Sequence, residues 1–310
     1  MNILLISYSR IGDTILATSL INYLIDNNPN SSFTIVTSSI SKDIFRDMPQ
    51  LSNLIVVDKE KNSKHWFKIW NKTKGIKWDL VVDLRSSYLS YFLRVKKRMI
   101  FRGNENRHKI QQFKTFLGSN DNIFPKIWAD PSNYNHIGRD KKLTNKYLCI
   151  APISNWTGKD WPIDRYSELL NKNFFEGFEI VILGASNDNK INKEVNSLEQ
   201  SINLKVNNLM NKADMIETYF ILKKAALFLG SDSSNMHISV AAQIPTIALF
   251  AVSNDKVYGP VGQNNLVIRG DKSYDEIKNE KAMNIRDEKF YIKDITVEKV
   301  LNQIKNIIKI

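Results

Sequence analysis

The chain has 310 residues, of which 43% are hydrophobic and 25% are charged. This length favours two domains, each able to bury its own core. No apolar stretch reaches the roughly 18 residues that a membrane-spanning helix requires, and the apolar run after Met1 lacks the length and basic residues of a signal peptide. The single cysteine, Cys149, has no partner for a disulfide or a metal site. These features predict a soluble, cytoplasmic protein without a metal ion.

The net charge of +12 is unevenly distributed along the chain. Residues 1–140 hold 21 Lys and Arg against 12 Asp and Glu, a net of +9, whereas residues 141–310 hold 23 against 20, a net of +3. Such a basic excess can bind nucleic acid, anionic lipid or a phosphorylated substrate, or can simply be solvated. Because no RNA- or DNA-binding motif accompanies it, nucleic acid is the weakest of these alternatives. Much of the excess lies in Arg94, Lys96, Lys97, Arg98, Arg102, Arg107 and Lys109.

The first part of the chain predicts alternating strands and helices. Residues 2–6 are continuously apolar, as in a strand of a parallel sheet. From Thr14 onwards, apolar residues recur at the spacing of an amphipathic helix, which Pro29 ends. Further strands are predicted at residues 33–37, 54–57 and 80–84. This alternation is typical of βαβ units.

A second set of strands follows a stretch rich in Asn, Asp, Pro and Gly. We predict these strands at residues 147–151, 178–183, 225–229 and 246–250, with helices at 216–224 and 297–308. The sequence therefore predicts an α/β protein with two doubly wound domains, 1–140 and 141–310, facing a central cleft. Ligands of such sheets bind beyond the carboxyl ends of the strands.

The first strand-to-helix turn contains Arg10, Gly12 and Asp13. Gly12 allows a tight turn or a close approach to a ligand. Asp13 stands where a carboxylate could take a proton from a substrate hydroxyl, or could merely cap the helix.

A similar junction follows the strand at 225–229. Asp232 and Ser233 open a helix whose free N–H groups and dipole suit a phosphate, although both residue types are also ordinary helix caps. His237 would lie one turn into that helix, near the anion site or simply packed.

Two further residues belong to the same predicted edge of the second sheet. Lys159 precedes the helix that begins near Pro162 and can add a positive charge near an anion. Asp188 follows another strand, where it can bind a ribose diol or cap the next helix.

The motifs Arg10-x-Gly12-Asp13, Lys159-x-Trp161-Pro162 and Gly230-x-Asp232-Ser233-x-x-x-His237, taken together and in this order, resemble glycosyltransferase family 9, the heptosyltransferases of lipopolysaccharide core assembly. The resemblance covers most of the chain. It implies a GT-B fold of two Rossmann-like domains, without a metal ion or other cofactor.

The resemblance also implies an inverting transfer between two substrates. The C-terminal domain would bind a nucleotide-activated sugar, typically ADP-heptose, through Lys159, Asp188, Asp232, Ser233, Ser234 and His237. The N-terminal domain would bind a phosphorylated, lipid-linked saccharide at the cytoplasmic face of the inner membrane, with Asp13 as the general base. We expect Arg10, Gly12, Arg98 and Arg102 to contact this acceptor.

The sequence departs from the family pattern at several positions. Ser234 stands where glycine is usual, Ala251-Val252 replaces Gly-Pro, Ser19 replaces a common proline, and Arg85 stands where glutamine is frequent. These differences bear on the sugar and the acceptor rather than the fold. The alternatives are a nucleotide-sugar epimerase or another enzyme on the same fold, and a binding module that has lost the chemistry.

Overall fold

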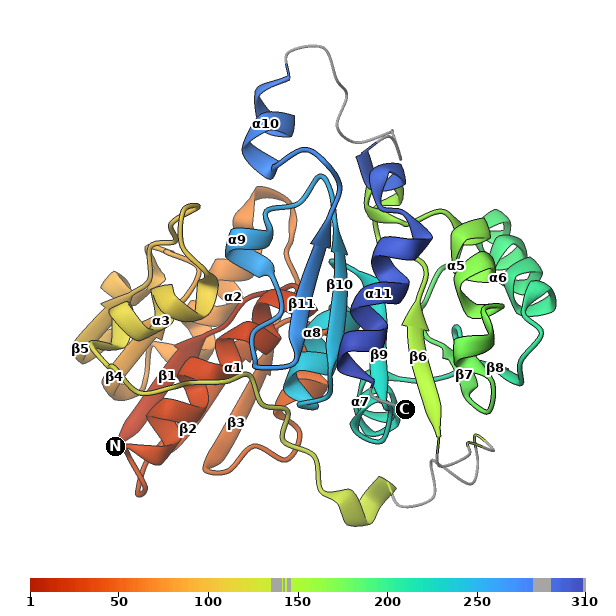
Figure 1. Cartoon of the computed structure of the whole chain (residues 1–310). Helices are drawn as coiled ribbons and strands as arrows, with labels where there is room; N and C mark the ends of the chain where they lie inside the picture. The colour runs from red at the N-terminus through yellow and green to blue at the C-terminus, as the bar shows by residue number, and fades with distance from the viewer. Residues whose placement is uncertain (135–140, 142, 144–145, 281–290, 309–310) are drawn as a thin grey trace. The chain divides into compact units, whose positions relative to one another are not determined.

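A computed structural model of the chain describes residues 1–134, 141, 143, 146–280 and 291–308. The chain divides into two compact units, Met1–Asp130 and Pro131–Ile310. Each unit contains one parallel sheet with helices on both of its faces (Figure 1). Residue 140, where the sequence places the end of the first domain, lies outside the described residues.

The first unit alternates strands with helices from its first residues. Its strands are β1 (Asn2–Ile6), β2 (Ser32–Thr37), β3 (Leu51–Val56), β4 (Lys77–Asp83) and β5 (Arg94–Ile100). Its α-helices are α1 (Ile11–Asp26), α2 (Lys64–Thr73) and α3 (Lys109–Leu117), and its 3-10 helices are η1 (Lys42–Phe45), η2 (Lys61–Ser63) and η3 (Leu89–Phe92).

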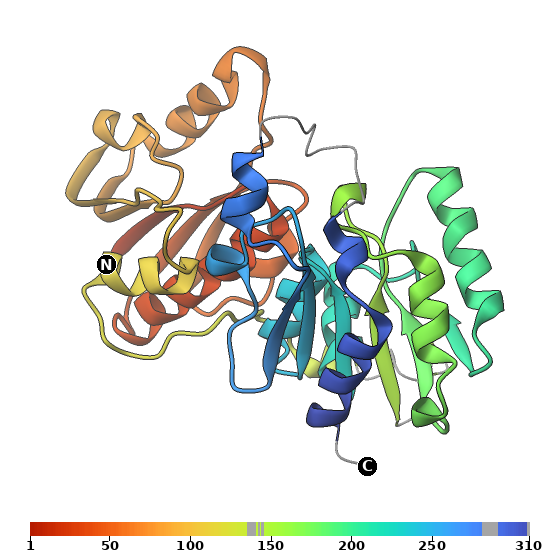
Figure 2. The same cartoon turned by 45° about the horizontal axis from the view of Figure 1, so that its top comes forward.

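The strands of this sheet bury side chains on both faces. Leu4 and Ile6 of β1 pack with Ile69 of α2 on one face, whereas α1 and α3 pack together on the opposite face (Figures 1 and 2). The continuous apolar run of β1 follows from this double cover, since neither face meets water. Only the basic strand β5 is largely exposed, as suits an edge strand whose charges discourage pairing with another chain.

The second unit repeats this plan with one more strand. Its strands are β6 (Tyr147–Ala151), β7 (Glu179–Ile182), β8 (Val206–Asn208), β9 (Leu227–Ser231), β10 (Thr246–Phe250) and β11 (Asn265–Arg269). Its α-helices are α5 (Ile163–Leu170), α6 (Asn189–Ser201), α7 (Met215–Lys223), α8 (Ser234–Ala241), α9 (Asp255–Tyr258), α10 (Tyr274–Asn279) and α11 (Val297–Ile307). Its 3-10 helices are η4 (Pro131–Tyr134), η5 (Thr157–Lys159), η6 (Asn173–Phe175) and η7 (Tyr291–Asp294).

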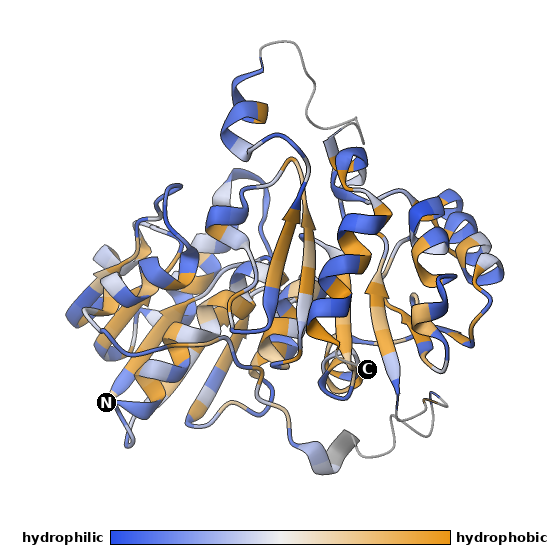
Figure 3. Cartoon of the chain, viewed as in Figure 1, coloured by the Kyte–Doolittle hydropathy of each residue, from blue (hydrophilic) through white to orange (hydrophobic). Residues whose placement is uncertain are grey.

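The core of the second unit lies between its sheet and the helices α5, α6 and α11. Leu148 and Ile150 of β6 pack there with Leu169 of α5 and Ile304 of α11. The central strands β6, β9 and β10 are accordingly largely apolar, and the helices turn polar faces outward (Figure 3). Cys149 is completely buried in β6, and burial raises the pKa of its thiol well above the ordinary value, as expected for a small core residue.

The strand orders place a switch point in each sheet. The first sheet has the order β3-β2-β1-β4-β5, and the second has β11-β10-β9-β6-β7-β8. In the first sheet, β2 and β3 therefore lie on one side of β1, and β4 and β5 lie on its other side. In the second sheet, β7 and β8 lie on one side of β6, and β9, β10 and β11 lie on its other side. Ligands of doubly wound sheets bind at such points, beyond the carboxyl ends of the two neighbouring strands. The turn that carries Asp13 follows β1, the loop that carries Lys159 follows β6, and the turn that carries Asp232 follows β9.

Candidate functional site

Lys159 and Asp232 meet at the switch point of the second sheet. They are 73 positions apart in sequence, but β6 and β9 pair directly, with Ala151 opposite Gly230. The pairing requires glycine at this position, because a Cβ on Gly230 would lie 3.0 Å from the Ala151 carbonyl oxygen and 2.8 Å from the Phe228 ring. The close packing of the two strands brings together the loops that follow them.

The two side chains form an ion pair that is largely shielded from solvent. Lys159 Nζ lies 2.5 Å from Asp232 Oδ2, with the side chains 18% and 11% exposed. His237 Nε2 lies 3.8 Å from the other carboxylate oxygen, Oδ1, and its side chain is 6% exposed. The Asp232 carboxylate therefore faces two basic side chains.

The start of α8 lacks the side-chain caps that the sequence allowed. Ser233 occupies the N-cap position in an extended conformation, but its side chain does not cap the helix. Within the described residues, Ser233 Oγ and the completely buried Ser231 Oγ have no hydrogen-bond partner. The first N–H groups of α8 and two hydroxyls are thus available beside Lys159. This is the arrangement that binds an anion at a helix N-terminus.

The loop that carries Lys159 is held by Asp160 and by Trp161 of the Lys159-x-Trp161-Pro162 motif. Asp160 is buried, and its carboxylate accepts a hydrogen bond of 2.8 Å from the Ser154 backbone N–H. The fully buried Trp161 donates from its indole to the Ile295 carbonyl oxygen at 2.9 Å. Lys159 also lies over the Trp156 ring, 5.6 Å from its centroid. These contacts fix the direction of the Lys159 side chain.

Arg269 holds the loop that follows β10. Arg269 donates to the carbonyl oxygens of Ala251 at 2.5 Å and Ser253 at 2.6 Å, and it pairs with Asp255 at 2.7 Å. Ala251 and Val252, which replace the usual Gly-Pro, are both buried. Arg269 thus stabilises this loop.

Asp188 is the N-cap of α6 and lies on the surface. Its carboxylate accepts a hydrogen bond of 2.7 Å from the Lys190 backbone N–H. The capping role that the sequence allowed is therefore present, and a ribose contact stays a prediction.

Asp13 lies in the first turn of α1, at the switch point of the first sheet. Arg10 is the extended N-cap residue, and its side chain is exposed, whereas Gly12 and Asp13 are half-buried. Among the described residues, none donates a hydrogen bond to the Asp13 carboxylate, so the capping alternative is absent for this side chain. The carboxylate can accept a hydrogen bond, and then a proton, from a substrate hydroxyl.

Lys109, which the sequence showed only as part of a basic run, is buried near Asp13. Its Nζ lies over the rings of Tyr8 at 5.1 Å and Phe101 at 4.9 Å. Burial lowers the pKa of Lys109, and the charge of Asp13 opposes this shift. The only sequence signal for the burial of Lys109 was the presence of Phe101 and Phe113 on either side of it. This signal could be used only if the strand that ends at Ile100 had been recognised.

A third group of polar residues follows β4. The fully buried Asp83 accepts hydrogen bonds from the backbone N–H groups of Arg85 at 2.9 Å and Ser87 at 2.8 Å, while burial raises the pKa of its carboxyl. Arg85, which replaces the family's glutamine, stacks over the Trp66 ring at 4.5 Å. The pKa of the neighbouring His65 is lowered, chiefly because His65 is itself buried and also because the charge of Arg85 is close. His65 Nε2 is buried without a hydrogen-bond partner in the described part of the chain.

The two predicted acceptor arginines of the β5 region differ in placement. Arg98 lies within β5, and its guanidinium donates to the carbonyl oxygens of Ser90 at 2.9 Å and Leu93 at 3.1 Å. It therefore stabilises the turn before the strand. Arg102 follows the carboxyl end of β5 and is exposed. Acceptor contact stays a prediction for both residues.

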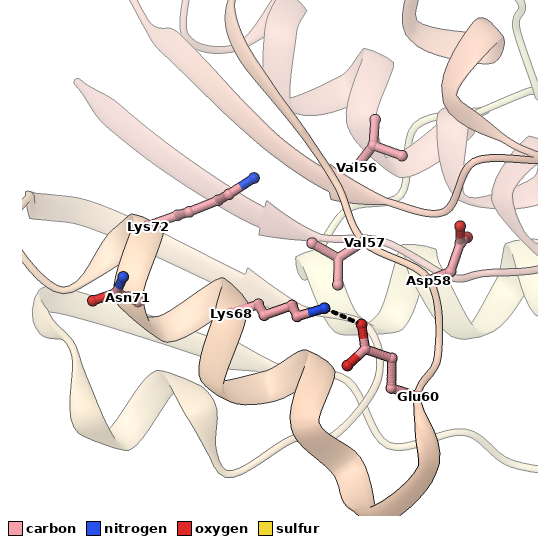
Figure 4. A pocket seen from close by; sticks show the side chains of 7 residues that line it. All are labelled: Val56, Val57, Asp58, Glu60, Lys68, Asn71 and Lys72. Atoms are coloured by element: carbon pink, nitrogen blue, oxygen red, sulfur yellow. Dashed lines mark hydrogen bonds and ion pairs between the residues drawn. The ribbon is translucent and has the colours of Figure 1, made fainter.

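A cavity of about 340 Å³ lies beyond the carboxyl end of β3 (Figure 4). Its lining includes Asp58, Glu60, Lys68 and Lys72, and Lys68 pairs with Glu60. None of the predicted site residues lines it. Across the described residues, no cluster of three or more His, Cys, Asp or Glu side chains is arranged to hold a metal ion. No helix in these ranges is long and apolar enough to cross a membrane.

Comparisons with known proteins agree with this geometry. Residues 111–286, more than half of the chain, match the model of glycosyltransferase family 9 (heptosyltransferase). Lipooligosaccharide heptosyltransferase 2 of Campylobacter jejuni is 24% identical over 96% of both chains. Among solved structures, a family 9 glycosyltransferase from Veillonella parvula has a TM-score of 0.83 and 21% identity, covering 99% of this chain and 96% of its own. The E. coli ADP-heptose lps heptosyltransferase II has a TM-score of 0.75 and 16% identity, covering 99% and 98%.

These similarities confirm the two-domain Rossmann-like architecture that the sequence predicts, and they extend over nearly the whole chain. The protein is therefore a glycosyltransferase of the GT-B fold and belongs to glycosyltransferase family 9, the heptosyltransferases.

Proposed function

We propose that this enzyme transfers heptose from ADP-heptose to a lipopolysaccharide-core-type acceptor, with inversion and without a metal ion. The observation that carries the proposal is the uncapped N-terminus of α8 beside Lys159 and the partnerless hydroxyls of Ser231 and Ser233. Names of the relatives support the sugar and the acceptor, since they include a lipooligosaccharide heptosyltransferase and an ADP-heptose heptosyltransferase.

The second unit would bind the donor. The diphosphate would lie against the first N–H groups of α8, near Ser233 and Ser234, with Lys159 supplying a full positive charge. Asp232 would act chiefly by holding Lys159 and His237 in place, because its carboxylate faces these groups and would repel a phosphate. Asp188 would bind the ribose through the carboxylate that caps α6.

The first unit would bind the acceptor and supply the base. Asp13 would remove the proton of an acceptor hydroxyl while that oxygen forms a bond to the anomeric carbon. The bond from this carbon to the diphosphate oxygen would break at the same time, and ADP would leave with the bonding electrons. Lys159 and the α8 N–H groups would stabilise the charge that develops on ADP. Attack from the opposite face inverts the anomeric configuration.

The acceptor chemistry would use the basic character of the first unit. Arg10, Arg102 and Arg98 are the predicted contacts for phosphate groups of a lipid-linked saccharide. The net charge of +9 in residues 1–140 favours such an anion and the anionic cytoplasmic face of the inner membrane.

A transfer assay tests this proposal. Purified enzyme is incubated with ADP-heptose, a deacylated lipopolysaccharide-core acceptor and EDTA, and the product is examined by NMR. We expect ADP release, a new glycosidic bond and an anomeric configuration opposite to that of the donor. Retained configuration would contradict the single displacement, and loss of activity in EDTA that magnesium restores would contradict metal independence. Transfer from UDP- or GDP-sugars but not from ADP-heptose would overturn the donor.

A further inference from the structure

Several aromatic side chains on and beside α2 and η3 of the first unit are exposed. Phe67 on α2 is 67% exposed, Phe92 of η3 is 72% exposed, and Tyr88 and Tyr91 are 80% and 60% exposed. Together with the partly exposed Trp70, these four residues are called the aromatic surface below. Large apolar side chains at such exposures need a reason when they cluster.

Direct contacts join the members of this surface. The rings of Phe67 and Trp70 lie 5.6 Å apart, and the Trp70 indole donates a hydrogen bond of 3.2 Å to the Phe92 carbonyl oxygen. Tyr91 donates its backbone N–H to the Tyr88 carbonyl oxygen at 3.1 Å. Two segments separated in sequence, α2 and η3, thus present their aromatic residues together.

Helix α2 has a separate face for the core. His65, Ile69 and Thr73 are its buried residues, and their spacing of four places them on one stripe. Phe67 lies on the opposite side of the helix from this stripe, whereas Trp70 lies between the two sides, is partly buried and packs against the core.

Basic side chains surround the aromatic surface. Lys74 Nζ lies 4.4 Å from the centroid of the Trp70 ring. Lys64 of α2, and Lys77 and Arg94 at the starts of β4 and β5, are exposed, whereas Lys72 lines the cavity beyond β3. The nearby acids Glu60 and Asp79 are already paired with Lys68 and Lys96. The surroundings are therefore positive.

We propose that the aromatic surface docks on a bilayer that contains anionic lipid. Trp, Tyr and Phe side chains favour the boundary between headgroups and acyl chains, and flanking lysines are attracted to anionic headgroups. The inference rests on the proposed function and deepens it, because it names the surface that meets the membrane. That surface is centred on the aromatic side chains of α2 and η3 rather than on the basic strand β5. It would bring the first unit to the place where a lipid-linked acceptor is anchored.

Vesicle co-sedimentation of the full chain tests this inference separately from sugar transfer. We compare vesicles of phosphatidylcholine alone with vesicles containing phosphatidylglycerol. The variant Phe67→Ser/Phe92→Ser removes two exposed rings, and Phe124→Ser, at a residue 50% exposed elsewhere in the same unit, is the matched control. Lys64→Gln/Lys74→Gln tests the charges, and Lys193→Gln on the second unit is its control.

We expect the wild type to bind the anionic vesicles, and 0.5 M NaCl to weaken that binding. The double Phe variant should bind at least about tenfold more weakly, the double Lys variant several-fold more weakly, and both controls should match the wild type. Unchanged thermal melting and unchanged ADP binding show that the variants remain folded. Absence of wild-type binding, or equal binding by the double Phe variant, would overturn the proposal. A wild-type dimer in solution that this variant converts to a monomer would also overturn it, because the surface would then join two copies.

Discussion

The switch points of the two sheets differ in how their charges are balanced. In the second unit, Lys159, Asp232 and His237 already face one another, so the site is assembled by its own contacts. In the first unit, the Asp13 carboxylate accepts no hydrogen bond from the described residues, and Lys109 lies among aromatic rings. Equivalent places in two similar sheets thus hold a cluster of paired charges, which we propose as the preassembled donor site, and a carboxylate without a hydrogen bond, which we propose as the base. Substitution of Lys159 in the second unit should affect structure and binding together, whereas substitution of Asp13 in the first should affect chiefly the chemistry.

The largest effect is expected from Asp13→Asn. If Asp13 is the general base, its removal should lower kcat by about 10²–10⁴-fold. ADP affinity should remain unchanged, and thermal stability should fall only slightly, because the carboxylate holds no hydrogen bond in the described structure but its charge favours the buried Lys109 ammonium. Steady-state transfer kinetics, ADP titration and a thermal melt measure the three quantities. Asp26→Asn, at the other end of α1, is the matched control, and near-normal turnover of Asp13→Asn would exclude this residue as the base.

Lys159→Met should weaken donor binding and destabilise the protein. Loss of a charge-assisted contact should raise the Kd for ADP about 10–100-fold, and leaving the shielded Asp232 unpaired should cost about 1–3 kcal/mol. Titration calorimetry and denaturant unfolding give the two values. In the double variant Lys159→Met/Asp232→Asn, stability should return while ADP binding stays weak. A double variant that binds ADP normally would show that Lys159 has only a structural role.

Lys109→Met should make the protein more stable at neutral pH. Burial lowers the pKa of Lys109, so the unfolded chain binds its proton more readily than the folded protein does. The charged form therefore costs stability at neutral pH, and this cost disappears as the pH rises through the folded pKa towards the unfolded value. We expect the variant to melt at a higher temperature than the wild type at pH 7, with a smaller difference at pH 10. A lower melting temperature at pH 7 would contradict this expectation.

The smallest effect is expected from Arg85→Gln, which restores the residue frequent in the family. The Arg85 side chain stacks on Trp66 and forms no hydrogen bond within the described residues, so stability should change by less than about 0.5 kcal/mol. If Arg85 contacts an anionic group of the acceptor, the acceptor KM should rise several-fold while the donor KM stays constant. Equal acceptor KM values for variant and wild type would remove Arg85 from the acceptor site.

Much of the fold could be predicted from local patterns in the sequence. The apolar runs at residues 2–6 and 147–151 are strands because both faces of each sheet are covered, and this leaves a continuous signal. Strand β5 was not predicted, since an exposed edge strand with four basic residues resembles a solvated surface. Its charges are part of the fold as well as of the surface, as the bonds of Arg98 to the preceding turn show.

The candidate site could be predicted only in part. Lys159 and Asp232 were identified from the residues of their turns, but their ion pair depends on β6 pairing with β9, which no local pattern reveals. Ser231 was an unassigned position in the polar turn after the strand at 225–229, and Lys109 was one residue of a basic run. Burial makes both relevant. Ser231 Oγ has no hydrogen-bond partner among the described residues, which is costly unless a ligand satisfies it, and Lys109 is a charge held among aromatic rings.

Calorimetric titration of the wild type and of Lys159→Met with ADP, UDP and GDP, in the presence of EDTA, is the decisive measurement for the preassembled site of the second unit. We predict selective binding of ADP by the wild type and a marked loss of affinity in the variant. Equal binding of all three nucleotides would contradict the adenine donor. Absence of binding to a well-folded wild type would contradict the assignment of α8 and Lys159 as the diphosphate site.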